Sequence, residues 1–204
     1  MDIVQAMPRL HHRPGSRSTR VLWLLEEIGA PYDVTIVSDE FRRSPEHFAK
    51  HPLGRVPFME LDDGTVMFES LACCLYLADA HPEAGLIGPS GSSERALTYQ
   101  WSVFAMTELE APMIALRTAR EAEVDIAPAL ERVNTAFQAV ADGLGDNEWL
   151  VGDSFTVADV VIVSNLGLAS SRGMLDGLPA LGAYVERGRG RPAFERAQGI
   201  GAPA

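Results

Sequence analysis

Two short motifs combine residue types that suit the binding of a small zwitterion: Val56-Pro57, the Val-Pro motif, and Glu69-Ser70, the Glu-Ser motif. Pro57 begins an apolar run, and a cis bond before it would reverse the chain and turn the N–H and C=O of Val56 outward. Such a backbone pair binds peptide-like ligands as an added strand does. Ser70 stands where a helix is expected to begin, which suits a carboxylate, whereas Glu69 suits an ammonium group.

A β-hairpin is expected between the two motifs. Residues 58–61 and Val66–Phe68 are short apolar runs joined by Asp62-Asp63-Gly64-Thr65, which is turn chemistry. A helix is expected over residues 71–80. Taken singly, Pro57 also fits an ordinary turn proline and Ser70 an ordinary helix cap, but their combination in this order and spacing is far less common.

The segments before the hairpin predict alternating strands and helices. A strand is expected over Arg9–His12, and Ser16-Arg17-Ser18-Thr19 opens a helix that ends at Gly29. Residues 32–37 form the next expected strand. Ser44 followed by Pro45 predicts a short helix over Pro45–Lys50. The resulting order, β-α-β-α-β-β-α, is the thioredoxin-like layout.

The motifs in this order resemble the glutathione-binding half of the glutathione S-transferase family. In that family a cis Val-Pro pairs with the cysteinyl backbone of glutathione, and a Glu/Asp-Ser pair holds its γ-glutamyl end. The resemblance implies that Val56, Pro57, Glu69 and Ser70 bind glutathione as co-substrate. Arg55 stands where the family often has Lys or Gln near the glycyl carboxylate or the peptide backbone, although it also fits an ordinary surface arginine.

From residue 94 onward the sequence predicts only helices. Residues 83–93 are rich in glycine, proline and serine, which interrupt helices and strands, so they are expected to form a linker. The linker separates an expected thioredoxin-like domain, residues 1–82, from an all-α domain, residues 94–204. The expected helices cover residues 96–120, kinked at Pro112, and residues 126–144, 160–169, 178–188 and 192–198.

A second motif lies in this half. Thr156 and Asp159 form a capping box, and Phe155 with Val160 forms its hydrophobic staple. The pattern Leu-x-Gly-x-x-Phe-Thr-x-Ala-Asp, which starts at Leu150, resembles the most recurrent motif of the transferases' helical domain. We interpret it as a local folding device.

A thiol has a pKa of about 8.5, so it needs help to become the nucleophilic thiolate near neutral pH. The resemblance places the helping group at the start of the first helix. Ser16 precedes Arg20 by four positions, as the active serine does in serine classes, and Ser18 is the second choice. Arg17 stands where the beta class has a cysteine, and no tyrosine lies there. Both serines also fit simple helix caps.

Composition excludes several other functions. The net charge of −11 argues against nucleic acid as a partner. No apolar run is long enough to span a membrane, and residues 1–8 lack a signal-peptide pattern, with Met7 as an alternative start. The adjacent Cys73 and Cys74 are poor disulfide partners, which favours the reducing cytoplasm. The five histidines, expected to be surface or packing residues, have no metal-ligand spacing, so no metal is expected.

Together with these features, the resemblance implies a cytoplasmic, homodimeric glutathione transferase with a role in detoxification. Its reaction would be attack of the glutathione thiolate on a small electrophilic, apolar substrate. Two alternatives remain open at this level: another glutathione-dependent reaction such as isomerisation, peroxide reduction or dehalogenation, and a non-catalytic binding or regulatory module.

Overall fold

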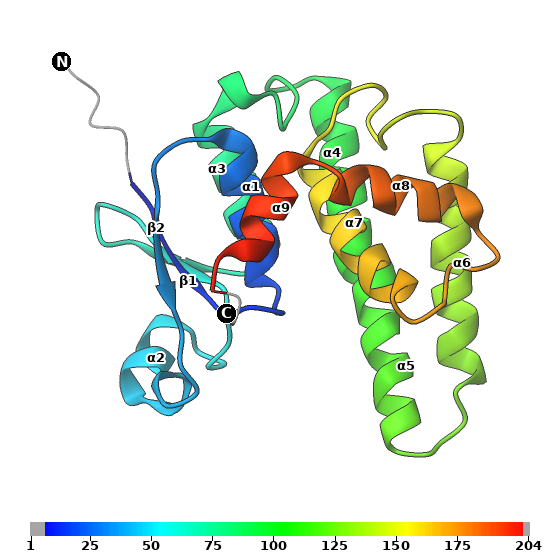
Figure 1. Cartoon of the computed structure of the whole chain (residues 1–204), viewed down its shortest axis with the longest axis horizontal. Coiled ribbons are helices and arrows are strands. Elements are labelled where there is room, and N and C mark those ends of the chain that lie inside the picture. Colours follow the sequence, from blue (N-terminus) through cyan, green and yellow to red (C-terminus); the bar gives the residue numbers. More distant parts are fainter. Residues whose placement is uncertain (1–6, 202–204) are drawn as a thin grey trace. The chain divides into compact units, whose positions relative to one another are not determined.

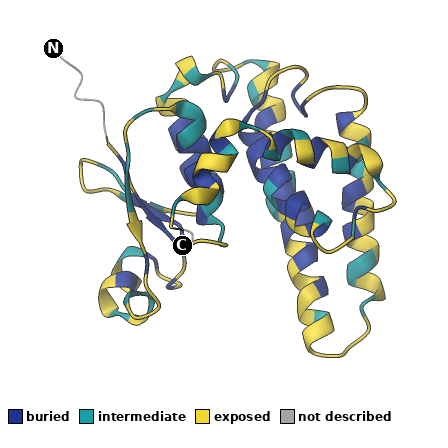
Figure 2. Cartoon of the chain, viewed as in Figure 1, coloured by how far each residue is buried: buried dark blue, intermediate teal, exposed yellow. Residues whose placement is uncertain are grey.

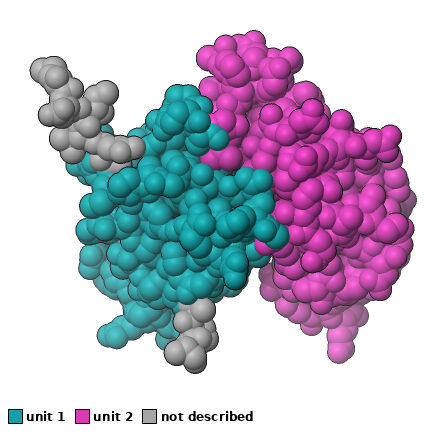
Figure 3. All heavy atoms as spheres, turned by 45° about the horizontal axis from the view of Figure 1, so that its top comes forward, with its two compact units in different colours: residues 1–84, 190–204 teal, residues 85–189 magenta. Residues whose placement is uncertain are grey.

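The computed structural model describes residues 7–201; residues 1–6 and 202–204 lie outside it, together with the expectations for the start of the chain. The chain divides into two compact units (Figure 3). The first contains the residues up to 84 and those from 190 onward, and the second contains residues 85–189. Within residues 7–201, no helix combines the length and the apolar character needed to cross a membrane.

The first unit is built on a four-stranded sheet with strand order β2-β1-β3-β4. β1 (Arg9–His12) pairs parallel with β2 (Asp33–Ile36) and antiparallel with β3 (Phe58–Glu60), which pairs antiparallel with β4 (Val66–Phe68). The helices are α1 (Ser18–Ile28), α2 (Pro45–Lys50), α3 (Ser70–Ala80) and α9 (Pro192–Gly199), with short 3₁₀ turns η1 (Phe41–Arg43) and η2 (Pro82–Ala84). This is the expected thioredoxin-like order.

Local sequence signals set several of these boundaries as predicted. The strand Arg9–His12 and the helix Pro45–Lys50 have their expected bounds. Ser44 caps that helix by accepting the N–H of His47 at 3.1 Å. Gly29 ends α1 with φ of 73°, a left-handed conformation that glycine adopts without steric cost.

α1 and α3 pack against the sheet, and α9 packs on α1. α1 packs against both other helices, and Figure 1 shows the three side by side. The core beneath them is fully buried, as the dark blue segments of Figure 2 show. Its largest members are Leu10, Leu22, Trp23, Leu24, Leu25, Phe58, Met59 and Leu77.

The C-terminal helix α9 returns to the first unit, which differs from the expected helical domain of residues 94–204. Arg191 binds Glu27 of α1 through two hydrogen bonds of 2.7 and 2.8 Å. Phe194 packs edge-on against Trp23 with ring centroids 4.9 Å apart. The amphipathic pattern of residues 192–198 predicts a helix, but it does not indicate which domain buries the apolar side of that helix.

The second unit is all-helical. Its helices are α4 (Ser93–Phe104), the π-helix η3 (Ala105–Glu110), α5 (Ala111–Glu121), α6 (Ala127–Leu144), α7 (Val157–Ser170) and α8 (Pro179–Arg189). The single helix expected over residues 96–120 is therefore interrupted by a π-helical turn just before Pro112. Because proline has no N–H and its ring crowds the carbonyl four residues earlier, the helix widens there.

The capping box at α7 is present as predicted. The N–H of Thr156 donates to Oδ2 of Asp159 at 2.8 Å, and the N–H of Ala158 donates to Oγ1 of Thr156 at 3.3 Å. Asp159 also accepts hydrogen bonds from the N–H of Leu150 and the hydroxyl of Tyr184, at 3.1 and 2.7 Å. α7 is buried along nearly its whole length, as expected for the central helix of this unit.

Candidate functional site

The predicted binding and catalytic motifs meet at one end of the sheet. The antiparallel register pairs His11 of β1 with Phe58, the first residue of β3, so the Val-Pro motif lies beside the end of β1. Phe58 also pairs with Phe68, the last residue of β4, so the Glu-Ser motif follows at the same end. The serine turn, residues 13–18, leaves β1 there as well. The sheet register therefore brings together three segments that are separated by tens of residues.

The serine turn is held by a compact set of hydrogen bonds. Oγ of Ser16 donates to the carbonyl of Arg13 at 2.7 Å and lies 2.7 Å from Oγ of Ser18. It also accepts the N–H of Ser18, the first residue of α1, at 3.2 Å. Ser18 is buried as the first residue of α1, whereas Ser16 is half-buried. Ser16 therefore bonds to the first N–H of α1, and part of its side chain stays accessible.

His12 lies directly behind the serine turn. Its Nδ1 is 2.8 Å from Oγ of Ser18, and its side chain is 1% exposed. Burial lowers the pKa of His12, and a hydrogen bond to the backbone of Ile200 raises it in part. Sequence reasoning treated the histidines as surface or packing residues and missed this contact, because no local pattern links positions 12 and 18.

The Val-Pro motif has the backbone geometry that its prediction required, since the Val56–Pro57 bond is cis. Gly54, in the turn before it, has φ of 58°, and a Cβ there would lie 2.7 Å from the ring of Phe48. Only glycine fits this turn without a shift. Within residues 7–201, the N–H and C=O of Val56 form no backbone hydrogen bond, and Arg55 is exposed.

The Glu-Ser motif places its two side chains differently. Glu69 has φ of 70°, which is uncommon for a residue with a side chain, and it is exposed. Ser70 begins α3 and is 2% exposed. Its Oγ accepts a hydrogen bond from Nη1 of the buried Arg20 at 3.5 Å. Arg20 served only as a spacing marker in the sequence, so its place beside Ser70 is new.

Two family models match the chain, one described as glutathione S-transferase, N-terminal domain, over residues 15–80, and one as glutathione S-transferase, C-terminal domain, over residues 104–192. The chain is also 31% identical to glutathione S-transferase GstA of Escherichia coli O157:H7 over 196 residues, which cover 93% of this chain and 96% of that protein. The chain belongs to the glutathione S-transferase family. The resemblance stated from the motifs is thereby confirmed.

Solved structures agree with this assignment. A sphingomonad glutathione S-transferase complexed with glutathione matches with a TM-score of 0.81 and 30% identity, over 93% of this chain and 96% of that one. A further relative is probable elongation factor 1-gamma 2 of Arabidopsis thaliana, 33% identical over 150 residues. That match covers 71% of this chain and 36% of the plant protein.

The cysteines of this glutathione S-transferase are not suited to nucleophilic chemistry. Both are buried in α3, and burial raises the pKa of Cys73 to about 12 and that of Cys74 further. In the described part of the chain, no group of three or more His, Cys, Asp and Glu side chains is arranged to hold a metal ion.

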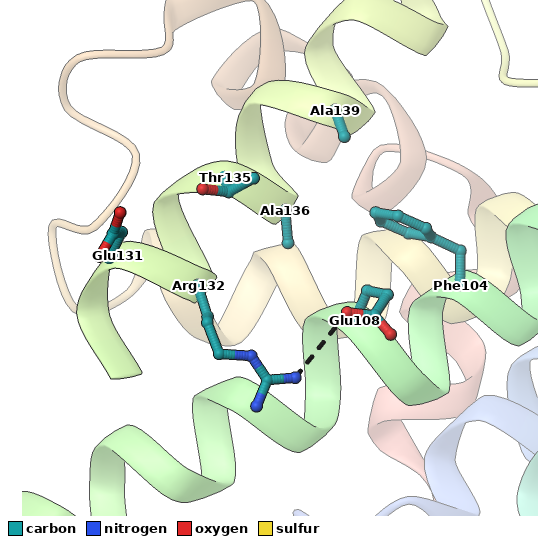
Figure 4. Close-up of a pocket in the computed structure, with 7 residues that line it drawn as sticks. All are labelled: Phe104, Glu108, Glu131, Arg132, Thr135, Ala136 and Ala139. Carbon is teal, nitrogen blue, oxygen red and sulfur yellow. Dashed lines mark ion pairs between the residues drawn. The ribbon is translucent and has the colours of Figure 1, made fainter. Parts of the chain in front are cut away.

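The helical unit of this glutathione S-transferase contains a pocket of about 250 Å³ between α4, η3 and α6 (Figure 4). Phe104, Ala136 and Ala139 supply apolar lining, and Glu108 and Arg132 form an ion pair of 3.8 Å. Its lining contains none of the residues that sequence reasoning assigned to catalysis or glutathione binding.

Proposed function

We propose that this protein is a glutathione transferase that activates the thiol of glutathione for attack on a small electrophilic, apolar substrate. The observation that carries the proposal is the convergence of the serine turn, the Val-Pro motif and the Glu-Ser motif at one end of the sheet. Proximity and thiolate activation would supply the rate.

The tripeptide would be held by groups of matching charge and hydrogen-bonding capacity. The N–H and C=O of Val56 would pair with the cysteinyl backbone, since they have no backbone partner of their own in the described chain. Ser70, at the start of α3 and bonded by Arg20, suits the carboxylate of the γ-glutamyl end. Glu69, exposed beside it, suits the ammonium group, and Arg55 the glycyl carboxylate.

The thiol sulfur would lie at the serine turn. Ser16 is the proposed donor to the sulfur anion, because its side chain is partly accessible while that of Ser18 is buried. Ser18 is the second choice. The positive end of the α1 dipole adds a potential that favours the thiolate. In the structure the O–H of Ser16 donates to the carbonyl of Arg13 at 2.7 Å, so it must turn toward the sulfur when glutathione binds.

Calorimetric titration of glutathione into the purified protein tests this function. Saturable binding that Ser70→Ala weakens about ten-fold or more would support both the ligand and the site. Ser90→Ala, at an exposed serine of the second unit, serves as the matched control and should bind as the wild type does. Absence of binding at millimolar glutathione would contradict the proposal.

Other glutathione chemistry on the same site is an alternative for the reaction type. Rates with aryl halides, hydroperoxides and cis-enones separate transfer, peroxide reduction and isomerisation, and halide release reports dehalogenation. The transferase proposal predicts the highest turnover with an aryl halide.

A non-catalytic module is the second candidate function. The match to an elongation factor 1-gamma protein favours it, because that relative is named for a role other than glutathione transfer. Glutathione binding without turnover of any electrophile, together with capture of a protein partner, would support this reading instead.

We also propose a homodimer in the cytoplasm with a role in detoxification. α4 exposes Leu97 and Val103, 41% and 53% accessible, which a second copy of the chain would cover. Sedimentation should then give twice the mass of one chain, and Val103→Lys should shift the equilibrium toward monomer. A wild-type protein that sediments as a monomer at micromolar concentration would contradict the dimer.

A further inference from the structure

We propose that His12 receives the thiol proton of bound glutathione through Ser18 and Ser16, and so acts as the positioning residue behind the serine donor. The inference rests on the proposed function and extends it to a residue that does not touch the substrate. It assigns a role to a buried histidine that neither the motifs nor the family matches single out.

The geometry forms a continuous chain of hydroxyl groups from the site to the ring. Oγ of Ser16 lies 2.7 Å from Oγ of Ser18, which lies 2.8 Å from Nδ1 of His12. Both distances are ordinary for hydrogen bonds between these groups. The chain runs from a half-buried serine to a ring that is 1% exposed, so its far end is shielded from water.

The tautomer of His12 follows from its two partners. The ring bonds to the backbone of Ile200, and this bond favours its protonated form, so the acceptor there is the carbonyl. We therefore assign the proton of the neutral ring to Nε2, opposite the nitrogen that faces Ser18. Nδ1 is then an acceptor, and the hydroxyl of Ser18 donates to it.

Proton transfer along this chain is balanced. The thiol gives its proton to Oγ of Ser16, Ser16 passes its own proton to Oγ of Ser18, and Ser18 passes its own to Nδ1 of His12. Glutathione becomes a thiolate and His12 an imidazolium, while both serines stay neutral. In the product state Ser16 donates to the sulfur, Ser18 donates to Ser16, and His12 donates to Ser18 and to the Ile200 carbonyl.

Reversal of the hydroxyl chain explains how Ser16 becomes a donor to sulfur. With neutral His12 the hydroxyl of Ser18 donates to the ring, and that of Ser16 turns from the carbonyl of Arg13 to Ser18 for the transfer. Once Nδ1 carries a proton, Ser18 no longer donates to it and turns toward Ser16. The O–H of Ser16 is then available to the thiolate.

The ionisable groups of the strands and turn next to His12 bond to one another, so the thiolate is the proposed counterion of a protonated ring. Asp33 of β2 pairs with Arg9, and Glu60 of β3 bonds to His11 and Lys50. Arg13 pairs with Asp39, and Arg20 of α1 donates to Ser70. Burial keeps His12 neutral in the free protein, and the negative sulfur at the other end of the chain stabilises its protonated form.

Nitrogen NMR of protein labelled with ¹⁵N-histidine tests the inference, because ring nitrogen shifts report protonation directly. At neutral pH we expect His12 neutral in the free protein and protonated with saturating glutathione. S-methylglutathione occupies the same site but has no thiol proton, so His12 should remain neutral with it. His12→Asn assigns the signals by removing them.

Two results would overturn the inference. The first is a His12 ring that stays neutral with saturating glutathione. In both His12→Asn and Ser18→Ala we expect the thiolate fraction of bound glutathione at neutral pH to fall about ten-fold or more. The second contradicting result is therefore a thiolate absorption that is unchanged in both variants. The double variant should show no further loss of thiolate, because both residues act in the same series of hydrogen bonds.

Calorimetry of the wild-type protein distinguishes an error in the inference on His12 from an error in the proposed function. If glutathione binds but His12 does not become protonated, only the inference on His12 is wrong. If glutathione does not bind, the proposed function itself is wrong. His81→Gln, a histidine that bonds to Glu83 outside the site, serves as the control and should leave the thiolate absorption unchanged.

Discussion

Nδ1 of His12 lies 2.8 Å from Oγ of Ser18, so a side-chain hydrogen bond joins the last residue of β1 to the first residue of α1. The N–H of Arg13 donates to the same hydroxyl at 3.1 Å. These contacts fix the serine turn against the sheet, and a donor held in place before its ligand arrives loses little entropy when it binds.

Ser16→Ala should lower turnover while leaving glutathione affinity nearly unchanged. A hydrogen bond to a charged acceptor contributes about 1.5–3 kcal/mol, so the rate constant should fall about 10- to 100-fold. Steady-state kinetics with an aryl halide, together with calorimetry of glutathione binding, measures both effects. Unchanged turnover would exclude Ser16 as the thiolate donor.

Glu69→Gln should weaken glutathione binding without an equal loss of turnover at saturation. The exposed carboxylate is the proposed partner of the ligand's ammonium group, and glutamine keeps its size but not its charge. We expect the dissociation constant to rise about ten-fold at low ionic strength, with a smaller effect at high salt. An affinity equal to that of the wild type at both salt concentrations would contradict this role.

The free energy of unfolding should fall as the pH drops below about 6.5, the ordinary pKa of histidine. Burial lowers the pKa of His12 in the folded state, so the unfolded chain binds more protons in this range and is favoured. His11, whose pKa burial also lowers, acts in the same direction. Urea denaturation at several pH values should show a smaller fall for His12→Asn than for the wild type; equal slopes would contradict this assignment.

Asp159→Ala should destabilise the helical unit by about 3 kcal/mol or more, because it leaves buried donors of Leu150, Thr156 and Tyr184 unpaired. Thr156→Ala removes a cap alone and should cost about 1 kcal/mol. Chemical denaturation compares the two variants. Equal losses would mean that Asp159 serves only as part of the capping box.

Arg191→Ala should destabilise the first unit by about 2 kcal/mol, because Glu27, whose side chain is only 8% exposed, loses both hydrogen bonds to the guanidinium. Arg196→Ala is the matched control on the same helix. Its pair with Glu26 is more exposed, 54% on the arginine side, so its loss should cost less than about 1 kcal/mol. The reverse order in thermal unfolding would contradict the importance of the Arg191 contact.

The sequence by itself determined the features whose causes lie within a few residues. The cap at Ser44, the left-handed Gly29 and the box of Thr156 and Asp159 act over one helical turn, so their patterns can be read directly. The Val-Pro and Glu-Ser motifs indicated the family on the same basis. The interruption ahead of Pro112 was predicted only as a kink, because a pattern of period 3.6 does not distinguish a bend from a widened turn.

Only the tertiary structure decided which distant residues meet. The pairing of His11 with Phe58 brings the motifs to one end of the sheet, and the path of the serine turn brings Ser18 to His12. The return of α9 to α1 likewise depends on the contact of Arg191 with Glu27, which are 164 positions apart. Such contacts depend on how buried surfaces of separate elements fit, and local propensity carries no information about that fit.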